Sequence, residues 1–280
     1  MKAHSTKDVW SNSDLITLKG QDWLDKQRIA GKVAAGALAL LENEVKNGTT
    51  KTLLELDKLA HDYIRDNKCQ ATFYLYKGFP NAVCMSVGNI KTKTNMLVHG
   101  IPTNTHLKAG MKLSVDLGCT FDDGEKGRGA IADTALTCVF GEPSTKQAQI
   151  IKDTKEALMR GIQAIKPNTR LGAIGAAIFK YGNGKGYGVI QNYGGHGLDW
   201  NQPHASPFVA NRSSENEGSR LTPGMTLAIE PMLTSGSIKT HVDPDKWTVH
   251  CEAEYSSHEE HSIYINKDWS VEIITDRVEL

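Results

Sequence analysis

The sequence lacks the features that mark several common classes of protein. Its 280 residues contain 32 basic and 32 acidic side chains, so no charge excess attracts a polyanion such as nucleic acid. Residues 1–14 lack the apolar core of a secretory signal, and the most apolar helical stretch, residues 29–41, is short and contains Lys32. We therefore expect no nucleic-acid partner and no membrane or targeting segment.

Cysteine and linker sequences are also scarce. The five cysteines are an odd number without CxxC spacing, which argues against a disulfide framework and a cysteine zinc site, and favours a reducing cytosol. No Pro/Gly/Ser-rich tract divides the chain. We expect an N-terminal extension over residues 1–20 and a single domain over residues 21–280.

Hydrophobic spacing predicts the elements of that domain. Three-to-four periodicity indicates helices over residues 21–44, 53–66, 144–165 and 171–181. β-Branched and aromatic segments indicate strands over residues 73–76, 83–87, 97–98, 112–117 and 136–140, near residue 189, and from residue 225 onward. The order helix, helix, strands occurs twice, which predicts a duplicated α+β domain.

An internal repeat supports the duplication. Residues 107–116 and 221–230 share the pattern L-x-x-G-M-x-L-x-[VI]-[DE], and the copies end in Asp116 and Glu230. A glycine turn followed by alternating apolar residues predicts a strand, with the acid on the face opposite Val115 or Ile229. Two related strands about a pseudo-twofold axis would direct both carboxylates into one central cleft.

Further candidates for chemistry stand in similar settings. Asp133 opens ADTALTCVF, His196 lies in YGGHG, and Glu260 begins EHSIYI. Each alone is more simply a strand-end acid or a turn histidine. Together with the acids of the repeat they make four carboxylates and one imidazole, and buried carboxylates require a compensating cation. This oxygen-rich set suits Mn, Fe, Co or Zn and exceeds the ligands of one catalytic zinc, which favours a dinuclear site.

Short motifs in this order resemble a known family. They are VHGIP (98–102), VDLG (115–118), ADT (132–134), GGHG (194–197), AIEPM (228–232) and EEHSI (259–263). The combination resembles the type I methionine aminopeptidases of the pita-bread fold, and the likeness runs from about residue 27 to residue 275. The resemblance implies an α+β pita-bread catalytic domain over residues 21–280 that hydrolytically removes N-terminal methionine from nascent proteins.

The resemblance also implies roles for the ligand set. Asp116 would chelate one of two divalent ions (Co, Mn, Fe or Zn), Asp133 and Glu260 would bridge both, and His196 and Glu230 would complete the other shell. Bound metal lowers the pKa of a water molecule and polarises the scissile carbonyl. Glu230 would then carry a proton from that water toward the leaving amine.

Other matching positions imply contacts with the substrate. His99 and His204 would contact the substrate backbone and stabilise the oxyanion, although a loop histidine that bonds to backbone is an equally simple interpretation for His204. An apolar pocket for methionine is implied at Tyr76, Phe79, Cys84 and Trp247. Aromatic and sulfur-containing walls suit a long polarizable side chain, but each of these residues would also fit an ordinary core.

The chain departs from the family pattern at several places. The segment 122–130 is longer than the usual hairpin and carries a polar tip, and a second insertion covers residues 89–95; both predict surface loops near the cleft. Ser257-His258-Glu259 stands where the family has Ala-Gln-aromatic. An aromatic residue is missing before His204, and Trp200 is a candidate to replace it.

Two alternatives remain open. A related pita-bread peptidase that cleaves before proline keeps the same ligands but typically carries a further N-terminal domain. About twenty residues precede the first predicted helix here, so we rank this interpretation below the favoured one. A non-catalytic binder of RNA or protein usually loses metal ligands, and all five are present. For the favoured function we expect nascent polypeptide N-termini near the ribosome as partners, a cytoplasmic location and a monomer.

Overall fold

The computed structural model describes residues 15–124 and 127–277. The expected helices are confirmed as α2 (Gln21–Lys46), α3 (Leu53–Asp66), α4 (Thr145–Gln163) and α5 (Gly172–Gly184). Two of them begin with reciprocal hydrogen bonds between the first and fourth residues of a capping box, Thr52 with Glu55 before α3 and Ser144 with Gln147 before α4. These caps fix where each helix starts, so its apolar face meets the sheets.

The strands of the described residues form three antiparallel sheets. The largest has the order β1-β4-β2-β3-β12-β11, with β5 also paired to β4. Its members are β1 (Gln70–Ala71), β2 (Cys84–Asn89), β3 (Thr94–Val98), β4 (Lys112–Phe121), β5 (Ala130–Val139), β11 (Thr240–Val242) and β12 (Val249–Cys251).

The second half of the chain builds the other two sheets. One has the order β15-β14-β9-β7-β8, from β7 (Gly195–Asp199), β8 (Gln202–Val209), β9 (Thr226–Ile229), β14 (His261–Ile265) and β15 (Val271–Ile273). The other has the order β13-β10-β6, from β6 (Gly188–Val189), β10 (Met232–Thr234) and β13 (Ser256–His258). The expected α+β class is thereby confirmed.

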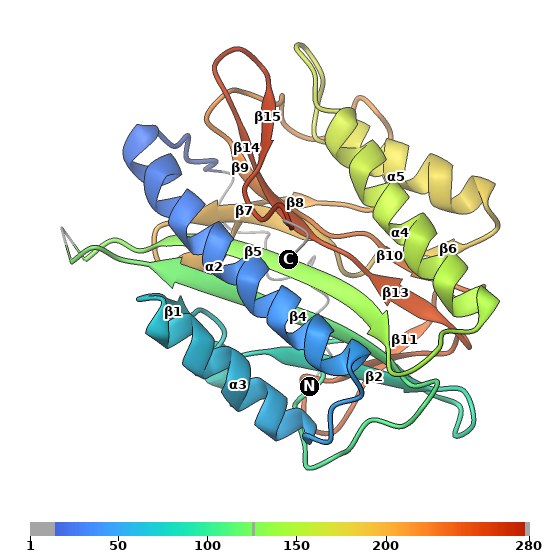
Figure 1. Cartoon of the computed structure of the whole chain (residues 1–280). Coiled ribbons are helices and arrows are strands. Elements are labelled where there is room, and N and C mark those ends of the chain that lie inside the picture. Colours follow the sequence, from blue (N-terminus) through green and yellow to red (C-terminus); the bar gives the residue numbers. More distant parts are fainter. Residues whose placement is uncertain (1–14, 125–126, 278–280) are drawn as a thin grey trace.

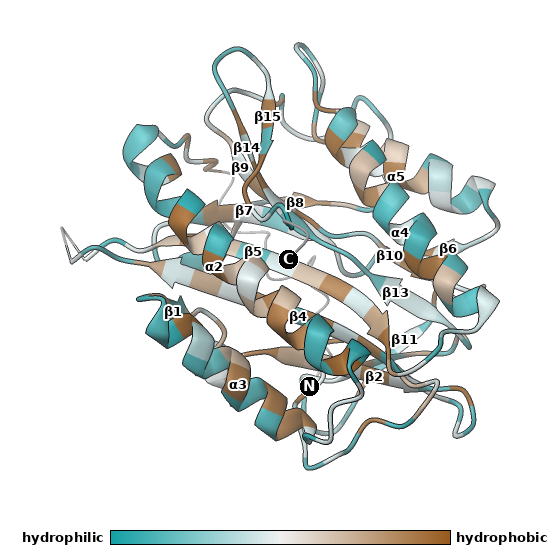
Figure 2. Ribbon diagram, in the orientation of Figure 1, coloured by the Kyte–Doolittle hydropathy of each residue, from teal (hydrophilic) through white to brown (hydrophobic). Residues whose placement is uncertain are grey.

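Helices cover one face of these strands. Figure 1 shows α2 crossing in front of β4 and β5, with α3 beside it, whereas α4 and α5 lie together over the later strands. Figure 2 shows hydrophilic and hydrophobic bands along α3 and α4, as amphipathic helices require. Each helix pair has its own buried apolar cluster. No helix among the described residues is both long and apolar enough to span a membrane.

The sequence repeat corresponds to a repeated local structure. Gly110 and Gly224 both have a positive φ, of 85° and 92°, which favours glycine. In each copy the next methionine donates a backbone hydrogen bond to the residue three before it, at 2.9 Å for Met111 and 3.1 Å for Met225. The same turn therefore leads into β4 in one half and into β9 in the other.

One strand prediction was wrong. Residues 73–76 form turns that lead into the short 3-10 helix η1 (Tyr76–Gly78), and Leu75 has a left-handed φ of 63°. The aromatic residues there suggested a strand, but Phe73 and Phe79 are instead buried in a separate apolar cluster. No strand was expected in the glycine-rich segment around residue 196, and this segment forms strand β7.

The glycines of β7 are required by its close neighbours. A Cβ at Gly195 would lie 2.1 Å from the carbonyl oxygen of Ala228, and one at Gly197 would lie 2.0 Å from that of Ser206. Side chains at these positions would push β7 away from β9 and β8. The missing side chains thus allow the strand pairing that positions His196.

The family departures have definite places. Trp200 packs edge-on against Trp23 of α2, with ring centroids 4.8 Å apart, so the suggestion that it replaces an aromatic beside His204 was wrong. Asp123 of the 122–130 insertion lies 3.0 Å from the ammonium of Lys26, while residues 125–126 lie outside the described part. In the predicted N-terminal extension, residues 1–20, residues 1–14 also lie outside the described part of the chain. Lys19 of this extension forms an ion pair with Asp199, at 2.6 Å.

Candidate metal centre and substrate cavity

Two aspartates of the first half share one face of the largest sheet. In the β4–β5 pairing Asp116 is opposite Ala135 and Gly118 is opposite Asp133. Because side chains two apart point to the same face, Asp116 and Asp133 are diagonal neighbours on that face. Gly118 places no side chain between them.

The second half contributes three residues from adjacent strands. His196 of β7 is opposite Ala228 of β9, Glu230 follows the end of β9, and Glu260 precedes β14, which also pairs with β9. Side-chain and backbone bonds join this region to β5: Thr134 Oγ1 donates to the Glu260 carbonyl at 2.9 Å, and the Glu260 amide donates to Ala135 at 3.0 Å. The halves of the chain therefore meet at these acids.

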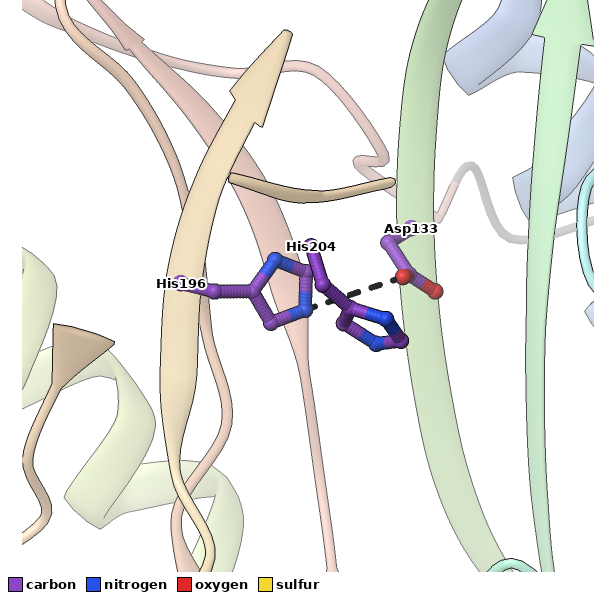
Figure 3. Close-up of side chains that lie close together, drawn as sticks. All are labelled: Asp133, His196 and His204. Carbon is purple, nitrogen blue, oxygen red and sulfur yellow. Dashed lines mark ion pairs between the residues drawn. The ribbon is translucent and has the colours of Figure 1, made fainter. Parts of the chain in front are cut away.

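The five predicted ligand positions converge. Nε2 of His196 lies 3.9 Å from Oδ2 of Asp133 and 3.7 Å from Oε1 of Glu230. Three sets of ligand atoms lie within 4.8 Å of one another: Asp116, Asp133 and Glu260; His196, Glu230 and Glu260; and Asp133, His196 and His204. Figure 3 shows His196 pointing from β7 toward Asp133 on β5, with His204 beside them.

The electrostatics of the cluster fit divalent cations. Burial, reinforced by neighbouring carboxylates, raises the pKa of Asp116 and Glu260 well above the ordinary range and that of Asp133 to about 8. Oδ1 of Asp116 and Oδ1 of Asp133 are buried without a hydrogen-bond partner. Ionised carboxylates this close repel one another, so cations bound between them would supply the missing compensation.

Glu230 differs from the other acids. Burial alone would raise its pKa, but His258, His196 and His99 together hold it below the usual value. Burial lowers the pKa of His99 to about 4, and that of His196 and His204 below the ordinary value. At neutral pH the site therefore combines one ionised glutamate with neutral imidazoles.

A cavity of about 210 Å³ opens beside Asp116. All six residues predicted to contact substrate line it, namely Tyr76, Phe79, Cys84, His99, His204 and Trp247. The rings of Phe79 and Trp247 meet edge-on with centroids 5.3 Å apart, and burial keeps the Cys84 thiol protonated by raising its pKa. The wall is thus largely apolar, and residues 89–95 are not among its lining residues.

Sequence reasoning missed several residues of the site. Phe73, Lys77, Tyr193, Val242, Lys246 and Val249 also line the cavity. Nε2 of the buried His258 lies 3.3 Å from Oε2 of Glu230. The departure from the family at residues 257–259 was the available signal for His258, but only the fold shows what it contacts.

The two neighbouring glutamates have different surroundings. Glu259 turns away from the cluster and pairs with Arg277 at 3.0 Å, while Glu260 joins two of the ligand sets. The expectation that Glu260, and not Glu259, belongs to the cluster rests on the Glu-His-Ser-Ile motif and agrees with this placement.

Known proteins define the class of this chain. Residues 25–267 match metallopeptidase family M24, and the chain belongs to this family. It is 37% identical over 263 residues to a methionine aminopeptidase of Mycoplasma capricolum, covering 93% of this chain and 98% of that protein. It is 34% identical to a methionine aminopeptidase of Salmonella typhimurium, with 94% of each chain covered.

A solved structure agrees in shape. The crystal structure of a methionine aminopeptidase from Rickettsia prowazekii matches with a TM-score of 0.84 at 31% identity, over 94% of this chain and 100% of that one. The expected family and pita-bread fold are thereby confirmed.

Proposed function

We propose that this protein is a metal-dependent aminopeptidase that hydrolyses the bond after an N-terminal methionine. The observation that carries the proposal is the convergence of acids and a histidine from both halves of the chain beside an apolar cavity. The similarity to methionine aminopeptidases over nearly the whole chain supports the substrate. Because both halves supply ligands, we treat residues 21–280 as one catalytic domain.

We assign two divalent ions, of Mn, Fe, Co or Zn, to Asp116, Asp133, His196, Glu230 and Glu260. Asp133, His196 and Glu260 each belong to two of the ligand sets, and of these three the two carboxylates, with two oxygens each, would be shared between the ions. Oxygen and imidazole donors suit these metals. When bound, the ions lower the pKa of water and polarise a carbonyl.

The remaining chemistry belongs to the protein's own side chains. Glu230 is ionised at neutral pH, so it can accept a proton from the attacking water and pass it to the leaving amine. His99 and His204 line the cavity as neutral imidazoles, and an imidazole N–H can donate to the substrate carbonyl as charge develops on its oxygen. Tyr76, Phe79, Cys84 and Trp247 enclose the methionine side chain.

We further propose that the substrates are nascent polypeptides near the ribosome and that the enzyme is a cytoplasmic monomer. The free thiols of its five buried cysteines suit a reducing compartment.

A comparison of two peptides tests the function. The chain is treated with a chelator, reloaded with Mn²⁺ or Co²⁺, and assayed with Met-Ala-Ser and Ala-Pro-Ala. We expect metal-dependent release of methionine and no cleavage of the proline peptide. Cleavage of Ala-Pro-Ala alone would overturn the substrate, and the absence of both bound metal and activity would favour a non-catalytic binder.

A further inference from the structure

Two imidazoles and a carboxylate lie together on the β11–β12 hairpin, outside the central cluster. His241 of β11 and His250 of β12 are directly opposite each other in the antiparallel register. Their rings are stacked, with centroids 5.3 Å apart and an interplanar angle of 9°. Both side chains therefore project from the same face of the hairpin.

Both imidazoles face one carboxylate. Nε2 of His250 lies 3.0 Å from Oδ2 of Asp243, and Nε2 of His241 lies 4.0 Å from Oδ1 of the same residue. The backbone of Asp243 is fixed at the start of the hairpin loop, because its amide donates to Thr248 at 2.9 Å and its carbonyl accepts from Lys246 at 2.9 Å. The carboxylate thus has a defined position between the two rings.

A simple hydrogen bond does not account for this arrangement. His250 alone satisfies one oxygen of Asp243, and the 4.0 Å separation of His241 is too long for a hydrogen bond. The side chain of His250 is 14% exposed and held in place, whereas that of His241 is 64% exposed and free to rotate toward the carboxylate. The group has one fixed imidazole, one fixed carboxylate and one adjustable imidazole.

We propose that His241, Asp243 and His250 form a second metal site, for a divalent ion of the zinc class. Opposed residues on antiparallel strands have Cβ atoms about 4.5–5.5 Å apart, which allows both Nε2 atoms to reach one ion at about 2.0–2.1 Å. Two imidazoles and a carboxylate leave a fourth position for water. On binding, the proton that His250 shares with Asp243 moves from Nε2 to Nδ1, which frees the lone pair for the metal.

The position of this site connects it to the substrate cavity. Val242, Lys246, Trp247 and Val249 of the same hairpin line that cavity. An ion that joins the two strands and the loop would restrain the part of the cavity wall that this hairpin forms. A wall that is already ordered loses less conformational entropy when substrate binds. On the proposed aminopeptidase function, zinc at the hairpin lowers the KM for Met-Ala-Ser.

Metal counting tests the site independently of catalysis. Asp133→Asn and Glu260→Gln are introduced together to disable the central cluster, because each of its ligand sets contains at least one of these two residues, and zinc uptake is measured by equilibrium dialysis. We expect about one equivalent in this background, and its loss when His241→Ala or His250→Ala is added. His106→Ala is the matched control, because His106 is an exposed histidine elsewhere that contacts the carbonyl of Thr50.

Proton NMR of the imidazole rings distinguishes the site from nonspecific uptake. Zinc should shift the ring resonances of His241 and His250 and leave that of His106 unchanged. No uptake in the background protein, or uptake that survives both hairpin substitutions, overturns the proposal. Circular dichroism checks that each variant is folded.

The coupling to substrate is tested with the central site intact. Added zinc should lower the KM for Met-Ala-Ser in the wild-type chain and not in His241→Ala. Any inhibition by zinc at the central site is common to both proteins, so it cancels in the comparison. An equal response of the two proteins refutes the coupling. If neither protein cleaves the peptide, the aminopeptidase proposal fails while the dialysis result still decides the hairpin site.

Discussion

Replacing Arg277 by methionine should strongly destabilise the protein. Its guanidinium lies 3.0 Å from Glu259, whose side chain is fully buried, and also donates to the carbonyls of Ala135 and Glu260. Removing one partner of a buried ion pair costs about 3–5 kcal/mol because the other charge is left uncompensated. At roughly 2–4 °C per kcal/mol, Tm should fall by about 6–20 °C.

Thermal unfolding with two further variants isolates the cause. Adding Glu259→Gln to Arg277→Met should recover most of the loss, because glutamine is uncharged and can still accept the 3.0 Å hydrogen bond from the Thr137 amide. Arg65→Met is the matched control, since this arginine pairs with Asp62 and Asp66 but is 63% exposed, so its replacement should leave Tm nearly unchanged.

The pH dependence gives a second check on the same reasoning. Burial, only partly offset by Arg277, raises the pKa of Glu259. A carboxyl whose folded pKa lies above its unfolded pKa costs stability as pH rises between the two values. Without Arg277 that pKa rises further, so Arg277→Met should be less destabilising at pH 5 than at pH 8. A double variant as unstable as Arg277→Met, or an equal loss at both pH values, would refute the argument.

Three further predictions concern the centre and a buried lysine. Asp116→Asn should abolish metal-dependent hydrolysis and the stabilisation by added Mn²⁺, which in the wild type is about 2.7 kcal/mol at a hundredfold excess over Kd; calorimetry with retained stabilisation would contradict this. His204→Ala should lower kcat by about 10²–10³ with little change in KM, and steady-state kinetics showing a change in KM alone would argue against an oxyanion contact. Burial lowers the pKa of Lys112 from 10.5 to about 8, so between these pH values the unfolded chain binds more protons than the folded chain. The free energy of unfolding should therefore rise with pH over this range. Denaturant titrations of Lys112→Met should show no such rise.

The sequence by itself determined the helices, the duplication and the chemical type of the site. Apolar spacing is a local signal, and it predicted α2 to α5 correctly. The repeat that ends in Asp116 and Glu230 is also local, since each copy contains its own glycine turn and strand. Motifs in a fixed order then identified the family.

Only the tertiary structure decided which side chains meet. Whether the segment around His196 is a strand depends on how closely β8 and β9 approach it. The contacts of His258 depend on the position of Glu230, at the end of a different strand. The stacked pair of His241 and His250 likewise exists only in one strand register. Such contacts join residues distant in sequence, and their distances are set by sheet pairing and burial, which no local pattern of residues contains.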